Sequence, residues 1–367
     1  MTPSQSSSAI PFLLGGKEFG PALDQDIRSA KKRVFVQTLS FEADEAGNLV
    51  ADALQACPAP DRRFLIDSYS AHFVNDRLIH SPSAWADSSL RREVKATRRL
   101  VSKLRQEGVS VERLHSRGWN PFRWFARDHK KLLVVDDRVA YVGGINLCAH
   151  NFAWHDSMLK FTDPKVVDFL AADFEKKKGA ASRIHLPLLD VYAVDGTNNA
   201  CIEEAAHALI GNAKKSLYLH CPYVTEPFLG WLAEAARRGV RVTLVTSGRN
   251  NRLFMRDSIQ DAAQRGGFDV FFTEGMTHFK LLIADGETLL TGSANFDLLS
   301  FQYQPEYVVI TKDPGLLDEI DRRIVGPQRE VRIAPPEKPL KPFQAWCARN
   351  AMAFTLSVMR RTLGKTE

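Results

Sequence analysis

Short hydrophobic runs alternate along the chain with segments whose hydrophobic residues recur at helical spacing. Residues 63–66 and 240–245 are apolar and rich in β-branched or aromatic side chains, which is typical of buried strands. Residues 47–56 and 226–238 have the three-to-four-residue periodicity of helices packed on a core. Helices that alternate with short buried strands predict an α/β fold built in layers.

The chain contains an internal repeat. Residues 29–36 (SAKKRVFV) resemble residues 212–219 (NAKKSLYL), and each segment is followed by a helix-like stretch and a second apolar run. Repeated segments of this length indicate a duplicated structural unit. We therefore predict two similar α/β/α-layered halves related by pseudo-twofold symmetry.

Each half also carries the same polar motif. Residues 129–136 read HKKLLVVD and residues 278–285 read HFKLLIAD, and 17 residues separate the histidine from a later asparagine in both. The shared pattern is H-x-K-x4-D followed by G-[GS]-x-N. Its members are His129, Lys131, Asp136, Gly144 and Asn146 in the first half, and His278, Lys280, Asp285, Ser293 and Asn295 in the second.

This spacing gathers groups suited to a phosphate. A strand places residues i and i+2 on one face, so each histidine projects with its lysine. The aspartate supplies turn chemistry, and the returning strand ends in small residues where the asparagine can approach a bulky anion. A single His-x-Lys is often a surface accident, but two sets at one spacing within a repeat are a strong signal. We expect no zinc at the candidate ligands His129, His150, His155 and His278, because lysine stands beside each motif histidine.

The two halves differ in length. Ala30 corresponds to Ala213, an offset of 183 residues, whereas the motif histidines are 149 apart, so the first half carries about 34 more residues (183 − 149). We expect this excess as a longer polar loop near residues 72–99. The expected halves are residues 1–184 and 185–331. Residues 332–367 are expected as a proline-rich linker and a basic amphipathic helix.

Composition and charge limit the class of protein, its partners and its expected location. Hydrophobic residues make up 44% of the chain and charged residues 25%, which excludes a disordered or fibrous class. A net charge of +6 favours anionic partners, such as membranes, phosphorylated substrates or nucleic acid, without choosing among them. The five cysteines form no C-x-x-C pair, which argues against disulfides and a thiolate zinc site. Residues 1–16 lack a basic segment, and no run of about 18 apolar residues occurs. We expect a cytoplasmic protein whose membrane contact, if any, is peripheral on the cytoplasmic face.

The duplicated motif resembles the signature of the phospholipase D superfamily, over roughly residues 11–331. Residues 127–129, 143–146 and 154–156, with 277–280 and 292–297, are similar to bacterial cardiolipin synthases. The sequence departs from the family at residues 299–300 (LS) and 304–306 (QPE), where Arg-Ser and Asn-x-Glu are common.

The resemblance implies a metal-free and cofactor-free exchange. One histidine attacks phosphorus to form a phosphohistidine, and the other protonates the leaving alkoxide and activates the incoming alcohol or water. His129 is the favoured nucleophile by family analogy. The oxygen-binding groups would be Lys131, Lys280, Asn146 and Asn295.

Two acidic residues lie at matched distances after the histidines. Asp156 follows His129 by 27 residues and Glu306 follows His278 by 28, so we predict that they orient the imidazoles. A local cap or salt bridge remains the alternative for Asp156. The motif aspartates are expected to fix turns and lysines.

The substrate prediction rests on two further segments. Residues 119–127 (WNPFRWFAR), with Trp124 and Arg127, suit a membrane interface beside a headgroup site that includes Gly144 and Ser293, although a buried hydrophobic plug is an open alternative. Residues 343–363 could lie on anionic lipid or pack on the body. We predict phosphatidyl transfer from a phospholipid to another lipid or a small alcohol, with hydrolysis as a side reaction. A nucleic-acid phosphodiesterase and a non-catalytic lipid-binding scaffold remain alternatives.

Overall fold

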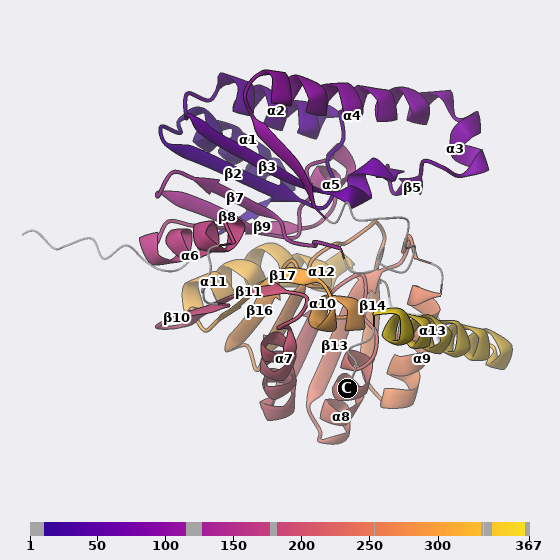
Figure 1. The fold of residues 1–367 in the computed structure, drawn as a ribbon. Coiled ribbons are helices and arrows are strands. Elements are labelled where there is room, and N and C mark those ends of the chain that lie inside the picture. The colour runs from indigo at the N-terminus through magenta and orange to yellow at the C-terminus, as the bar shows by residue number, and fades with distance from the viewer. Residues whose placement is uncertain are drawn as a thin grey trace, which may run out of the picture. The chain divides into compact units, whose positions relative to one another are not determined.

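The computed structural model describes residues 11–114, 127–176, 182–252, 254–331, 333 and 340–363. These residues form two compact units, each built around its own sheet (Figure 1). Unit 1 holds the described residues up to Leu186, and unit 2 holds those from Pro187 onward.

The sheet of unit 1 has seven strands in the order β1-β9-β8-β7-β2-β3-β6. Strands β2, β3 and β6 are parallel to one another, and the remaining pairs are antiparallel. The strands are β1 (Phe12–Gly15), β2 (Arg33–Thr38), β3 (Asp61–Asp67), β6 (Ser110–Leu114), β7 (Leu132–Val135), β8 (Val139–Gly143) and β9 (Ser157–Phe161).

Helices cover both faces of this sheet. Val34 and Val36 point into a core shared with α1 (Gly16–Arg28), α2 (Glu45–Ala56) and α4 (Ser88–Gln106). Phe35, between them, points the other way and stacks on Phe174 of α6 (Pro164–Phe174), with ring centroids 4.5 Å apart. A short helix, α5 (Ala149–Ala153), follows the first motif.

Residues 72–99 of unit 1 are not a loop, so that prediction was wrong. After a short 3-10 turn they form a small hairpin, the helix α3 and the first part of α4. Asp87 caps α4 by accepting the N–H groups of Ser89 and Leu90, and buried Leu90, Val101 and Leu104 supply its apolar face. The 3-10 turn is η1 (Ser68–Ala71), the hairpin is β4 (Phe73–Val74) with β5 (Arg77–Leu78), and α3 is Pro82–Ala86.

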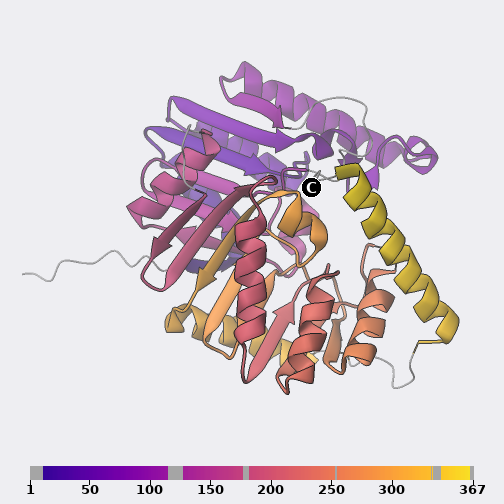
Figure 2. The ribbon, with the colours of Figure 1, turned by 60° about the horizontal axis from the view of Figure 1, so that its bottom comes forward.

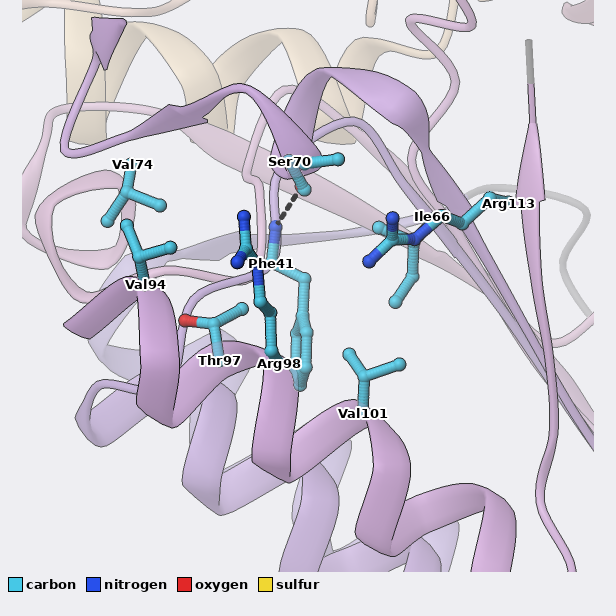
Figure 3. A pocket seen from close by; sticks show the side chains of 10 residues that line it. Phe41, Ile66, Ser70, Val74, Val94, Thr97, Arg98, Val101 and Arg113 are labelled. Atoms are coloured by element: carbon cyan, nitrogen blue, oxygen red, sulfur yellow. Dashed lines mark hydrogen bonds between the residues drawn. The ribbon is translucent and has the colours of Figure 1, made fainter. Parts of the chain in front are cut away.

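A small cavity lies where α4 meets η1 (Figure 3). Its wall combines Phe41, Val94 and Val101 with the guanidinium groups of Arg98 and Arg113. The hydroxyl of Ser70 closes one side by accepting the N–H of Phe41 at 2.8 Å. No motif residue lines this cavity, so it is distinct from the site that the sequence predicts.

The second sheet, whose strands other than β10 belong to unit 2, has the order β10-β11-β17-β16-β15-β12-β13-β14. Strands β12, β13 and β14 are parallel. The strands are β10 (Arg183–Leu186), β11 (Leu189–Asp195), β12 (Ser216–His220), β13 (Arg241–Ser247), β14 (Asp269–Thr273), β15 (Leu281–Ala284), β16 (Thr288–Gly292) and β17 (Pro305–Thr311). The helices are α7 (Ala200–Asn212), α8 (Phe228–Arg237), α9 (Met255–Gly266), α10 (Leu298–Gln302), α11 (Pro314–Ile320), α12 (Gly326–Val331) and α13 (Pro342–Leu363), with a π-helical turn at Asp321–Val325.

The two units repeat one topology. Apart from edge strand β10, the strands of unit 2 follow the order of unit 1 position by position, with β7 matched by β15 and β2 by β12. The repeat extends to α6 and α11, each of which begins with proline after an aspartate cap, Asp163 or Asp313. The prediction of two similar α/β/α-layered halves is confirmed at the level of fold.

The last helix of unit 2, α13, packs on α9 (Figures 1 and 2). Arg349 forms an ion pair with Asp261 of α9 at 2.7 Å, and Ala345, Ala348 and Met359 are buried. Within the described part of the chain, no helix combines the length and hydropathy that crossing a membrane requires.

Candidate active site

The two motifs occupy equivalent places at the start of a central strand. His129 and Lys131 directly precede β7, and His278 and Lys280 directly precede β15. All four side chains are at most 8% exposed. The Lys131 ammonium donates to the carbonyl of His129 at 2.7 Å, and the Lys280 ammonium lies 2.6 Å from both the carbonyl and Nδ1 of His278. Each lysine therefore stays beside its own histidine, as the spacing predicted.

A polar side chain at the end of the second parallel strand anchors the residue before each histidine. Oδ2 of Asp67, the last residue of β3, accepts the N–H of Asp128 at 2.9 Å. In unit 2, Oγ of Ser247, the last residue of β13, accepts the N–H of Thr277 at 3.0 Å. Sequence reasoning missed both anchors. The available signal was that each strand ends in a polar residue after an apolar run.

The two motif asparagines are held by the helix that follows them. Nδ2 of Asn146 donates to Oδ1 of Asn151 in α5 at 2.9 Å. The N–H of Asn295 donates to Oγ of Ser300 in α10 at 3.2 Å. The Oδ1 atoms of Asn146 and Asn295 are both buried, and neither has a hydrogen-bond partner among the described residues. Each of these two buried carboxamides can therefore still accept a hydrogen bond, which suits the recognition of a polar ligand.

The carboxylates placed 27 and 28 residues after the histidines contact the second residue of each G-[GS]-x-N segment. A Cβ atom on Gly144 would lie 2.4 Å from both carboxylate oxygens of Asp156, so a larger residue there would require the Asp156 side chain to move. In unit 2 the hydroxyl of Ser293 donates to Oε2 of Glu306. The structure thus places Asp156 and Glu306 at corresponding positions, both buried. Their orientation of the imidazoles stays a prediction.

The motif aspartates lie at the far end of β7 and β15 from the histidines. Asp136 accepts the N–H groups of three consecutive residues that lead into β2, and Asp285 does the same for β12. Burial opposes the charge on both carboxylates, but these backbone hydrogen bonds lower the pKa of each below its ordinary value. Asp136 lies five positions after Lys131, and five steps of extended chain span roughly 16 Å. The two aspartates anchor the sheet and lie away from the histidine end.

Of the aromatic segment before the first motif, only Arg127 is described. Its guanidinium lies 4.2 Å from the ring centroid of Tyr69 and 5.2 Å from that of Phe73. Trp124 lies outside the described residues, so its predicted part in substrate binding stays a prediction.

The duplicated fold and paired motifs define a phospholipase D superfamily enzyme, and comparison with known proteins agrees. The family model described as "Cardiolipin synthase, PLD-like domain" matches residues 23–178 and 207–325, and the chain belongs to this family. Cardiolipin synthase A of Pseudomonas fluorescens (strain SBW25) is 27% identical over 88% of this chain and 69% of its own. Cardiolipin synthase B of Escherichia coli (strain K12) is 24% identical over 84% of this chain and 78% of its own.

A solved structure supports the fold. The phosphatidylserine synthase of Haemophilus influenzae Rd KW20 superposes with a TM-score of 0.70, covers 97% of this chain and 98% of its own, and is 17% identical. At this identity the likeness establishes the two-unit architecture and leaves the substrate to be argued from the site.

Proposed function

We propose that this protein transfers phosphatidyl groups, taking them from a phospholipid and passing them to an alcohol or a second lipid. The observation that carries this proposal is the presence of two complete buried sets of histidine, lysine and asparagine, one in each unit. The relatives named cardiolipin synthase support a phospholipid as the substrate.

The reaction proceeds in two displacements at one phosphorus. In the first, an imidazole nitrogen of His129 attacks, a phosphorus–nitrogen bond forms, and the bond to the departing alkoxide breaks. His278 gives its proton to that alkoxide. In the second, His278 takes the proton of the incoming alcohol, whose oxygen attacks phosphorus and releases His129. Water in place of the alcohol gives hydrolysis.

The neighbouring groups stabilise the charge that builds up on phosphorus. The ammonium groups of Lys131 and Lys280 bind the non-bridging oxygens, together with the carboxamides of Asn146 and Asn295. These donors are buried, so their interaction with an anion is weakly screened by water. The carboxylates Asp156 and Glu306 fix the orientation of the imidazoles.

Peripheral contact with anionic lipid belongs to the same proposal. Phe343, Trp346 and Phe354 recur at spacings of three and eight residues on α13, and their side chains are 74%, 55% and 71% exposed. Arg360 and Arg361 follow in the last turn. Exposed aromatic rings with nearby arginines suit a headgroup layer of negative charge.

Substrate class is tested by offering purified protein a mixture of phospholipids with glycerol, and separately single-stranded DNA. A His129→Ala/His278→Ala double variant serves as the control for contaminating activity. The proposal expects headgroup exchange on lipid that the double variant lacks. DNA cleavage without lipid exchange would identify the nuclease alternative, and no turnover of either substrate would favour the binding scaffold.

The membrane contact has its own experiment. Sedimentation with phosphatidylglycerol vesicles is compared for the unchanged chain and a Phe343→Ser/Trp346→Ser/Phe354→Ser variant. We expect binding to fall roughly 10-fold or more in the variant. Equal binding by both proteins would remove α13 from the proposal without affecting the chemistry.

A further inference from the structure

Three side chains of types that can bind metal ions lie close together in unit 1, apart from the histidine and lysine of the first motif. Glu42 follows β2, and Cys148 and His150 stand at the start of α5. One ligand atom from each lies within 4.8 Å of the other two. Sγ of Cys148 is 3.6 Å from Nε2 of His150, and Oε2 of Glu42 is 3.9 Å from Nδ1 of the same ring.

Two of the facing atoms lack hydrogen bonds. Glu42 is 2% exposed, and its Oε1 accepts the N–H of Asn75 at 3.0 Å. Its Oε2 and Nδ1 of His150 are buried and have no hydrogen-bond partner among the residues that the structure describes. Their separation of 3.9 Å is too long for a hydrogen bond. A buried carboxyl oxygen without a partner is costly, and a cation bound to Oε2 of Glu42 would remove that cost.

The charges around Glu42 also favour a cation. The carboxylates of Asp44 and Glu93 each place an oxygen within 4.8 Å of one on Glu42. Oδ2 of Asp76 lies 3.9 Å from Nε2 of His150. Acidic side chains thus surround a cysteine and a histidine, a donor set whose sulfur and imidazole nitrogen suit zinc better than calcium or magnesium.

We propose that Glu42, Cys148 and His150 bind one Zn²⁺ ion, with water in the fourth position. Zinc bonds of about 2.3 Å to sulfur and 2.0 Å to nitrogen place those two atoms roughly 3.5 Å apart, which matches the separation of Sγ and Nε2. The proposal departs from our expectation that His150 and the cysteines bind no zinc. That expectation rested on motif lysines and on C-x-x-C spacing, whereas these ligands come from two distant segments.

The ion would hold the segment that carries Asn146. Cys148 lies two residues after Asn146. The side chain of Asn146 donates a hydrogen bond to Asn151 in α5. The N–H of Ala149 donates to Oδ2 of Asp44, so α5 is already tied to the acidic cluster. Zinc would therefore stabilise the position of the carboxamide without touching the substrate.

The test uses the full chain, stripped with a chelator and titrated with Zn²⁺ against a chromophoric competitor. We expect one tightly held ion per chain and affinity roughly 100-fold weaker or more in Glu42→Gln, Cys148→Ser and His150→Gln. Cys57→Ser and His80→Gln, which alter a buried cysteine and a histidine of the same unit, should bind as the unchanged chain does.

Binding of cobalt tests directly whether a cysteine thiolate is one of the ligands. Co²⁺ bound to the unchanged chain should show the near-ultraviolet absorption of a cobalt–thiolate bond, and Cys148→Ser should lose it. A folded chain that takes up no zinc would overturn the proposal. So would bound cobalt without a thiolate band, or zinc affinity unchanged in Cys148→Ser.

Discussion

The carboxylate of Asp67 accepts the backbone N–H of Asp128 at 2.9 Å, and this bond fixes the residue that directly precedes His129. Oδ1 of Asp67 also accepts the N–H of Tyr69, and the side chain is only 1% exposed. Unit 2 repeats the arrangement with Ser247 and Thr277. The duplication therefore preserves an anchor for each histidine as well as the histidine itself.

Replacement of this anchor should reduce both stability and turnover. Asp67→Ala leaves buried N–H groups without acceptors, which should lower the free energy of unfolding by about 2–3 kcal/mol and kcat at least about 10-fold. Urea unfolding and headgroup exchange measure the two effects. Asp61→Ala, at the other end of β3, is the matched control and should change both by much less. Normal turnover in Asp67→Ala would show that the anchor does not position His129.

The motif aspartates should matter for stability more than for chemistry. Asp285→Ala removes the acceptor for the N–H groups of Lys214, Lys215 and Ser216, at a cost of about 1–2 kcal/mol in unfolding free energy. Below the unfolding temperature, kcat should stay within about 10-fold of the unchanged enzyme, with the same pH profile. A shifted pH profile in folded Asp285→Ala would instead indicate that this carboxylate takes part in proton transfer.

Replacement of a motif lysine should reduce activity more than stability. Lys280→Met keeps the length of the buried side chain and removes the charge that we propose binds the phosphate, so kcat/KM should fall roughly 100-fold or more while the fold persists. Lys214→Met, on an exposed residue of unit 2, should leave kcat/KM unchanged. Headgroup exchange and circular dichroism on both variants make the comparison. Full activity in Lys280→Met would remove this ammonium from the mechanism.

Unit 1 contains a charge network with a predictable pH dependence. Burial opposes the charge on Asp26, but hydrogen bonds from Lys160, Tyr141 and Arg138 outweigh it and lower its pKa. A lowered folded-state pKa gives stability that is complete above the ordinary pKa of about 3.9 and is lost as pH falls through the folded-state value. Asp26→Asn should thus cost roughly 2–4 kcal/mol at neutral pH and progressively less in acid.

Urea unfolding between neutral and acidic pH checks this dependence. Asp24→Asn, on the same helix and in an exposed ion pair with Arg28, should show a small effect at every pH. A cost of Asp26→Asn that stayed constant as pH fell would mean that the charge of Asp26 does not stabilise the fold.

The sequence was most informative where a pattern occurred twice. The matching segments at Ala30 and Ala213 and the two motifs predicted duplicated sheets, because coupled repeats constrain strand order and spacing. The stretch between β3 and β6 is longer than its counterpart between β13 and β14, and its polar composition concealed the few apolar positions of α4 that pack on the core. Its folding into a helix could not be predicted from periodicity alone.

Side-chain anchors and ligand clusters were harder to predict. Asp67 and Ser247 are single polar residues at strand ends, and their partners lie 61 and 30 residues further along the chain. Glu42 and Cys148 are likewise joined only by the fold. Such contacts leave no local pattern, because they depend on which strand ends meet in three dimensions.

Transient labelling of the enzyme tests the central claim most directly. The chain is mixed briefly with phosphatidylglycerol labelled at phosphorus, quenched in alkali, where phosphohistidine survives, and assayed for label on protein. Both His129→Ala and His278→Ala should have lost headgroup exchange. Label should appear on the unchanged chain, should appear more slowly on His278→Ala, which lacks the acid for the departing alkoxide, and should be absent from His129→Ala. Label retained by His129→Ala, or exchange retained by either variant, would contradict a mechanism in which His129 attacks phosphorus and His278 serves the departing and incoming alcohols.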